Sequence, residues 1–134
     1  KFLDHIVRTS REAGLRQIET RLCEPDSVDL APNSVDLVFI CDTYHHFEFP
    51  LRTMASIHQA LKPGGRLVVV DFRRIPGTST EWVLNHVRAG QEVVEREITQ
   101  SGFRKSAESA DSTVRPFHQV LARSSLKPEP DHHE

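Results

Sequence analysis

The chain has 134 residues, 37% of them apolar, which is enough for one domain with a hydrophobic core. Its formal net charge of −2 at pH 7 argues against a dedicated nucleic-acid binder, which normally carries a strongly basic face. No apolar run approaches the ~20 residues that a membrane span requires.

The cysteines of the chain, Cys23 and Cys41, lie inside predicted strands and do not form spaced pairs. We therefore expect reduced thiols in the core rather than a disulfide or a metal site. Reduced thiols in turn indicate a cytoplasmic protein. Because the chain begins with Lys-Phe-Leu-Asp, already within a predicted helix and without an initiator Met, we expect an N-terminal segment to precede it.

The first predicted elements are a helix and a short strand. Apolar residues recur at helical spacing over residues 1–13, and Gly14 follows where a left-handed cap would end the helix. Residues 18–22 alternate between apolar or β-branched and charged side chains, which predicts a strand that Pro25 closes. An acidic loop over residues 24–34 follows.

The clearest feature is the stretch of residues 36–49, DLVFICDTYHHFEF. Residues 37–41 form an apolar run of the kind that predicts a strand buried on both faces in a parallel sheet. The next residues, 42–46, are abruptly polar. Because ligands bind beyond the carboxyl ends of strands in open α/β sheets, we expect a pocket at this point.

A helix and a second apolar strand come next. Pro50 suits the first position of a helix whose apolar stripe runs to Leu61, and the glycines of residues 62–65 (KPGG) predict a tight turn with positive φ. Residues 67–72 (LVVVDF) form the second strand. Two such strands joined by one helix predict a right-handed βαβ unit with parallel strands.

The remaining chain predicts a broken helix and then a hairpin. Thr78 and Glu81 fit a capping box that opens the helical region, which Gly90 divides and Gly102 ends.

Residues 104–109 and 116–122 are predicted strands. The loop between them is too short for a crossover helix, so the pair should be antiparallel. We take residues 1–123 as the domain and residues 124–134, rich in Pro, Asp and His, as a disordered tail.

Several short motifs resemble, in their order along the chain, the later part of a class I S-adenosylmethionine-dependent methyltransferase of type 11, the group that includes the ubiquinone and menaquinone methyltransferases. They are Pro25-Asp26 with the segment LAPNSVD at 30–36, His45-His46, the segment LKPGGRL at 61–67, and Gly102-Phe103. The resemblance covers residues 2–122. It implies an α/β fold with a Rossmann-like, three-layer αβα arrangement, a mostly parallel sheet and a C-terminal antiparallel hairpin.

The resemblance also implies that the cofactor is S-adenosylmethionine, bound in part by Asp26, Ser27, Cys41 and Asp42. Asp26 stands where the family has a carboxylate that accepts a hydrogen bond from the adenine amino group. Pro25 departs from the usual glycine there and removes one backbone donor. Cys41 and Asp42 would approach the methionine part of the cofactor.

Tyr44, His45 and His46 are the candidate catalytic residues. The cofactor supplies an activated methyl group, so the protein must align the acceptor, exclude water and in some cases remove a proton, which an imidazole can do. The alternative for each histidine is a structural role. His86 and Arg88 are candidate substrate-binding residues, Arg88 as a clamp for an anion, and their alternative is a solvated helix surface.

Asp42, Asp71 and the histidines at 45, 46 and 86 also suggest a metal site. We expect no metal, because adjacent histidines do not easily face one ion and no helical His-x-x-x-His accompanies them. A Ser-His-Asp hydrolase is not expected either, since the sequence lacks a Gly-x-Ser-x-Gly elbow.

The family's first two strands and its Gly-rich loop have no counterpart here, and the sequence contains no Gly-x-Gly. The family's strand order, 3-2-1-4-5-7-6, would put those strands between residues 18–22 and 37–41. We therefore expect an exposed edge on the central strand. Either the chain forms a homodimer or swaps strands through this edge, or it draws residues 18–22 into the gap, or it is the remainder of a cleaved longer protein.

Our leading interpretation is part of a methyltransferase domain, inactive alone, that acts on a small-molecule substrate without nucleic-acid or membrane partners. Two alternatives remain open. One is a noncatalytic α/β binding or interaction module. The other is half of a nicotinamide-dependent dehydrogenase, which the C-terminal hairpin disfavours.

Overall fold

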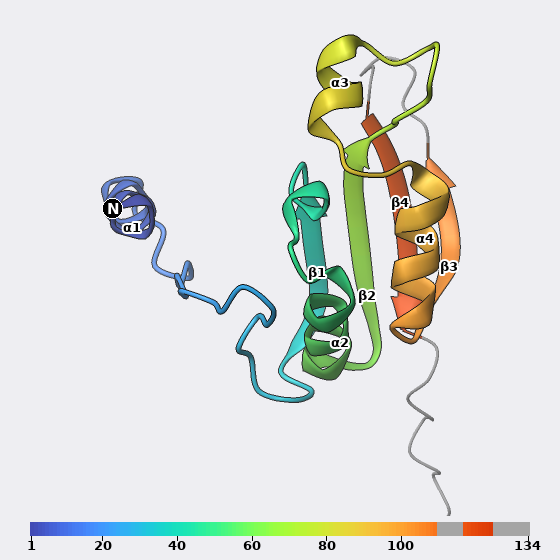
Figure 1. Ribbon diagram of the computed structural model, residues 1–134. Coiled ribbons are helices and arrows are strands. Elements are labelled where there is room, and N and C mark those ends of the chain that lie inside the picture. The colour runs from blue at the N-terminus through green and yellow to red at the C-terminus, as the bar shows by residue number, and fades with distance from the viewer. Residues whose placement is uncertain (110–116, 125–134) are drawn as a thin grey trace, which may run out of the picture.

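The computed structural model describes residues 1–109 and 117–124, so residues 125–134 of the predicted tail lie outside the described part. Its helices are α1 (Phe2–Glu12), α2 (Pro50–Ala60), α3 (Glu81–His86) and α4 (Gln91–Gln100), with a short 3-10 turn, η1 (Tyr44–His46). Its strands are β1 (Val35–Cys41), β2 (Leu61–Phe72), β3 (Phe103–Ser109) and β4 (Phe117–Ser124) (Figure 1). The described helices have at most 11 residues, and none is both long and apolar enough to cross a bilayer.

The strands form one sheet in the order β1-β2-β4-β3. β1 and β2 are parallel, whereas β4 is antiparallel to both β2 and β3. The predicted parallel βαβ pair and the C-terminal antiparallel hairpin are therefore confirmed. Because Cys41 pairs with Val70, the polar residues after β1 come to lie beside the end of β2.

β1 is buried on one face only, and the prediction that both its faces are covered is wrong. Ile40 is 7% exposed, whereas Leu37 and Phe39 are 52% and 61% exposed. Successive side chains of a strand point to opposite faces, and α2 and α4 lie on the same side of the sheet while α1 stands apart (Figure 1). β1 is also an edge strand of the described sheet, as the sequence predicted.

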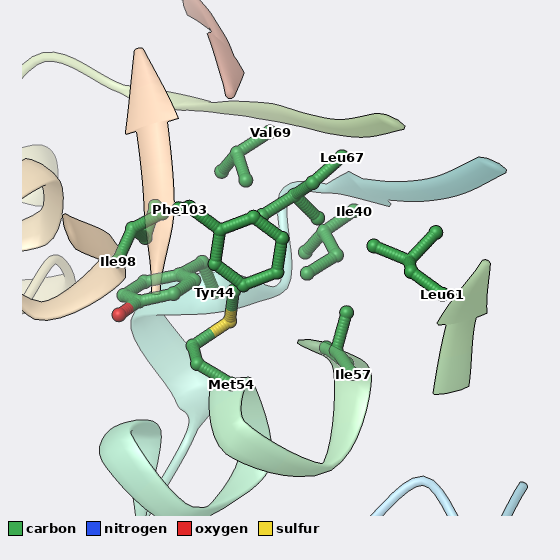
Figure 2. Packing of buried hydrophobic residues seen from close by; sticks show 9 residues of the cluster. All are labelled: Ile40, Tyr44, Met54, Ile57, Leu61, Leu67, Val69, Ile98 and Phe103. Carbon is green, nitrogen blue, oxygen red and sulfur yellow. The ribbon is translucent and has the colours of Figure 1, made fainter. Parts of the chain in front are cut away.

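The described hydrophobic core joins β1, β2 and β3 to α2, α4 and η1 (Figure 2). Its buried members are Ile40, Tyr44, Met54, Ile57, Leu61, Leu67, Val69, Ile98 and Phe103. Tyr44 and Met54 are 0% exposed. Full burial of one such side chain contributes roughly 1.5–3 kcal/mol. The polar loop after β1 is therefore anchored in the core through its own tyrosine.

The predicted turn at residues 62–65 lies within β2, which begins directly at Leu61 after α2. The register between β1 and β2 shifts between Val35 and Leu37, and Gly64 has a φ of +75°. A Cβ on Gly65 would lie 2.8 Å from the carbonyl oxygen of Lys62. The first glycine thus supplies the left-handed backbone and the second supplies space.

Residues 18–22 do not form the predicted strand in the described chain. An isolated bridge joins Glu24 to Ser27, but no described strand pairs with residues 18–22. Alternating side chains make a segment suitable for a sheet, yet a strand also needs a neighbour for its backbone groups. Cys23 and Cys41 are free, as predicted, but both are exposed and the prediction of core thiols is wrong.

The helix boundaries largely follow the predictions. α1 ends before Gly14, whose φ is +72°, and Gly90 separates α3 from α4. The predicted cap at Thr78 is wrong: Thr80 is the N-cap, and its hydroxyl accepts a hydrogen bond from the Val83 N–H. The N–H of Thr78 instead donates to the Ile75 carbonyl within a preceding turn.

Candidate functional site

The polar loop that follows β1 turns sharply beside the end of β2. Asp42 has a φ of 52°, a left-handed value that aspartate tolerates better than most residues, and its N–H donates to the Val70 carbonyl at 2.8 Å. The η1 turn follows at once and brings Tyr44 and His45 into the interior. The local sequence thus places the exposed Asp42 next to the buried side chains of Tyr44 and His45 on one short turn.

His45 is fixed by Asp71, which lies near the end of β2. The His45 ring Nδ1 is 2.7 Å from Asp71 Oδ1, and the His45 backbone N–H donates to Asp71 Oδ2 at 3.1 Å. The Phe72 N–H also donates to Asp71 Oδ1, at 2.7 Å. A neutral imidazole that donates from Nδ1 carries its lone pair on Nε2. The carboxylate therefore selects the ring orientation and the tautomer.

The Nε2 atom of His45 is buried and has no hydrogen-bond partner within the described chain. The His45 side chain is only 3% exposed, and the closest charged group recorded for Nε2 is Asp42 Oδ1, at 3.9 Å. That separation is too long for a hydrogen bond. Since buried polar atoms are normally satisfied, we expect a water molecule, an ion or a ligand atom at this position.

His46 and His86 complete a histidine cluster, which we define as His45, His46 and His86. The ring centroid of His45 lies 4.1 Å from that of His46 and 5.6 Å from that of His86, and His46 and His86 are 5.4 Å apart. His86 stacks on Trp82 at 4.5 Å with an interplanar angle of 16°. The structure therefore places His86, a predicted substrate-binding residue, beside His45 and His46, which are predicted catalytic residues.

Tyr44 belongs to a polar triad with Glu97 and Arg88. The Tyr44 hydroxyl donates to Glu97 Oε2 at 2.8 Å, and the Arg88 guanidinium donates to both Glu97 oxygens at 2.9 Å. Both predicted site residues are thus held by a carboxylate. The catalytic role of Tyr44 and the anion-clamp role of Arg88 stay predictions that these contacts do not favour.

The triad shifts the pKa values of its members in the directions its hydrogen bonds require. Burial and the bond to Glu97 raise the pKa of Tyr44 well beyond its ordinary value. The hydrogen bonds that Arg88 donates to Glu97 outweigh burial and raise the pKa of Arg88. Burial opposes ionisation of Glu97, but the bonds from Arg88 and Tyr44 together lower the pKa of its carboxyl group. The triad therefore joins η1 to α4 with Glu97 ionised and Tyr44 protonated.

The free energy of unfolding should fall less steeply between pH 7 and pH 3 in Glu97→Gln than in the unaltered chain. A carboxyl group whose folded pKa is lowered stabilises the fold above its unfolded pKa of about 4.3, and this contribution is lost as pH falls through the folded value. Urea unfolding followed by circular dichroism between pH 7 and pH 3 measures it, with Glu19→Gln, an exposed glutamate, as the control. Equal slopes in Glu97→Gln and the unaltered chain would contradict the prediction.

A small cavity of about 20 Å³ lies next to His45. Its lining residues come from η1, β2, the segment 87–89 and α4, and they are His45, Val69, Asp71, Phe72, Val87, Arg88, Ala89, Gln91 and Val94. This volume is about that of one water molecule. The cavity is thus too small for an organic acceptor, which would have to contact the exposed side of the histidine cluster.

The predicted cofactor-binding residues lie on two segments. Cys41 and Asp42 are exposed at the end of β1. Asp26 is on the loop before β1, where Arg52 of α2 approaches its carboxylate at 3.4 Å. The Ser27 hydroxyl accepts from the Asp29 N–H at 3.1 Å. The recorded contacts tie this loop to α2 and not to the histidine cluster.

Asp71 and Glu97 are the residues that sequence reasoning undervalued. The sequence analysis considered Asp71 only as a possible metal ligand and did not consider Glu97. Asp71 carried a usable signal, because an acidic residue near the end of an apolar strand lies at the edge where ligands bind. The sequence offered no such signal for Glu97, because an acidic residue between the apolar positions of a helix normally belongs to its solvent-exposed face.

Comparison with known proteins gives a consistent family match. A family profile described as a methyltransferase domain matches residues 2–69. The chain is 32% identical over 70 residues to the uncharacterized protein YafE of Escherichia coli, and 32% identical over 65 residues to tRNA U34 carboxymethyltransferase of Desulfotalea psychrophila. It is 28% identical over 64 residues to phosphoethanolamine N-methyltransferase 1 of Triticum aestivum.

These alignments cover 52%, 48% and 48% of the chain but only 34%, 20% and 13% of the respective relatives. The chain therefore spans about a third or less of the length of these relatives. The fold is similar to that of a SAM dependent methyltransferase from Aquifex aeolicus, with a TM-score of 0.77 and 18% identity over 92% of this chain and 63% of that one. A methyltransferase from Mesorhizobium loti gives a TM-score of 0.68 at 21% identity, over 90% of this chain and 76% of that one.

Proposed function

We propose that this chain, which belongs to the methyltransferase domain family, is the later part of a catalytic domain that transfers a methyl group from S-adenosylmethionine to a small-molecule acceptor. The observation that supports this most strongly is the parallel pairing of β1 and β2. It brings the polar residues after β1 and Asp71 to one edge of the sheet, where ligands of such folds bind.

The cofactor of this family is S-adenosylmethionine, which supplies a methyl group already activated by its sulfonium centre. Asp26, Ser27, Cys41 and Asp42 are the residues that we assign to it. The carboxylates of Asp26, which is partly exposed, and of Asp42, which is exposed, suit the donors and positive charge of the cofactor. Asp42 supports the assignment best, because it is half exposed at the end of β1 and its contact with His45 is long.

On the acceptor side, we assign proton removal to His45. Its Nε2 atom is buried and lacks a hydrogen-bond partner in the described chain, and Asp71 holds the ring from the opposite nitrogen. A base of this kind needs a free lone pair and a fixed direction. His46 and His86 are exposed beside it and would contact the acceptor.

A small molecule is preferred over a nucleic acid as acceptor because the net charge of −2 offers little attraction for phosphates. The relatives include both classes by name, a tRNA carboxymethyltransferase and a phosphoethanolamine methyltransferase. The exposed free cysteines support a reducing compartment such as the cytoplasm.

Titration calorimetry with S-adenosylhomocysteine tests the cofactor assignment. The product should bind to a longer protein that includes any residues encoded before Lys1, and only weakly to the present chain. In that longer protein, Asp42→Asn should weaken binding about 10–100-fold, the value of a hydrogen bond to a charged group. Asp36→Asn is the matched control, since Asp36 is also an exposed aspartate of the β1 region and pairs with Lys62. Equal binding by both variants would remove Asp42 from the site.

A second candidate function is a noncatalytic interaction module. The exposed Leu37 and Phe39 beside the outer edge of β1 favour it, because an apolar face next to an open strand edge suits association with another chain. The homodimer or strand swap predicted from the sequence would use this edge. Absence of S-adenosylhomocysteine binding by both the present chain and the longer protein would support this function over methyl transfer.

A further inference from the structure

We propose that the histidine cluster, His45, His46 and His86, is a binding site for a divalent transition-metal ion of the zinc class. One ring nitrogen from each histidine lies within 4.8 Å of the corresponding nitrogens of the others. Imidazole nitrogens are preferred ligands of zinc, copper, nickel and iron, whereas magnesium and calcium prefer oxygen. The chemistry of the donors thus selects the class of ion.

His45 is already arranged as a metal ligand. Its side chain is 3% exposed, and its Nε2 atom has no hydrogen-bond partner in the described chain. Asp71 accepts from the other ring nitrogen at 2.7 Å. A carboxylate that holds the far nitrogen of a metal-binding histidine is a recurrent arrangement, because it fixes the tautomer and raises the basicity of the ligand. The ring of His45 is therefore held by Asp71 while its Nε2 atom has no hydrogen-bond partner in the described chain.

The other two histidines can close around the same point. Ligands about 2.0–2.1 Å from a tetrahedral ion are about 3.3 Å from one another, so the donor atoms must approach slightly. His46 and His86 are both exposed and can adjust their side-chain torsions, while His45 stays fixed. The stack of His86 on Trp82 limits the orientation of the His86 ring.

The objection to two adjacent histidines does not hold for this backbone. In the η1 turn the rings of His45 and His46 lie on the same side, with centroids 4.1 Å apart and planes inclined by 45°. Asp42 adds a negative charge, with Oδ1 3.9 Å from His45 Nε2. Three imidazoles and a nearby carboxylate suit a divalent cation and leave a position for water or another ligand.

Metal binding and proton removal would use the same lone pair of His45. An ion on Nε2 prevents that nitrogen from accepting a proton, so metal loading should inhibit methyl transfer. This consequence rests on the proposed function, whereas the metal site itself does not.

The site can be tested with Co²⁺, whose visible absorption reports coordination, and with Zn²⁺ in competition. Because His132 and His133 near the C-terminus could bind metal on their own, every protein should carry His132→Ala and His133→Ala. We expect one ion per chain and displacement of Co²⁺ by Zn²⁺. His86→Gln and His46→Gln should each weaken binding at least 10-fold, and Asp71→Asn about 10–100-fold.

His5→Gln is the matched control, since His5 is an exposed histidine of α1 that contacts Arg8, and it should leave Co²⁺ binding unchanged. Circular dichroism checks that the variants fold. Absence of Co²⁺ binding, or equal binding by His86→Gln, His46→Gln and His5→Gln, would overturn the proposal. Co²⁺ binding without S-adenosylhomocysteine binding by the longer protein would remove the methyltransferase function and leave the metal site standing.

Discussion

Replacing Tyr44 by alanine should lower the free energy of unfolding by about 3–5 kcal/mol, the usual cost of removing a large aromatic side chain from a core. Tyr44 is 0% exposed and packs among Met54, Ile98 and Phe103 in the core cluster (Figure 2). Its hydroxyl also donates to Glu97 at 2.8 Å. The substitution would therefore leave both a cavity and a carboxylate with one donor fewer.

Urea unfolding followed by circular dichroism measures this effect, and two further variants separate its parts. Tyr44→Phe keeps the ring and removes only a hydrogen bond to a charged group, so it should cost about 1.5–3 kcal/mol. Phe39→Ala removes an aromatic ring that is 61% exposed and should cost much less than Tyr44→Ala. If Tyr44→Ala costs no more than Phe39→Ala, the packing described for η1 is wrong.

The sequence predicted the order of the elements because the two apolar strands and the helix between them are set by local composition. Residues 37–41 and 67–72 are recognisable alone, and one helix between two strands leaves the parallel pairing as the natural connection. The antiparallel hairpin followed from a loop too short for a crossover. These predictions depended on neighbouring residues in the chain, and the described structure confirms them.

The errors concern properties that only neighbours in space decide. Residues 18–22 alternate like a strand, yet no strand of the described sheet pairs with them. Leu37 and Phe39 look like core residues, but the packed helices cover only the opposite face of β1. The candidate site shows the same limit: the contact between His45 and Asp71 crosses 26 positions, and that between Tyr44 and Glu97 crosses 53. No local pattern reports such pairs.

His45 gives the prediction with the largest expected effect on activity. In the longer protein that binds the cofactor, His45→Ala should lower the turnover number for methyl transfer about 10²–10⁴-fold, the usual contribution of general base catalysis. The Michaelis constant should change much less, since the buried imidazole acts on the proton rather than on acceptor binding. Transfer of a radiolabelled methyl group from S-adenosylmethionine measures both, with His5→Gln as the control.

Asp71 is the positioning residue for that base, and its effect should depend on His45. Asp71→Asn removes the carboxylate that selects the Nε2 lone pair, so it should lower turnover in the unaltered background but add little to His45→Ala. Added imidazole should restore part of the activity of His45→Ala, because the substitution leaves the space of the ring empty. It should restore none of the activity of Asp71→Asn, because the His45 ring is still in place in that variant. If the two losses multiply instead, Asp71 acts through stability or the cofactor, and His45 is not the base that it orients.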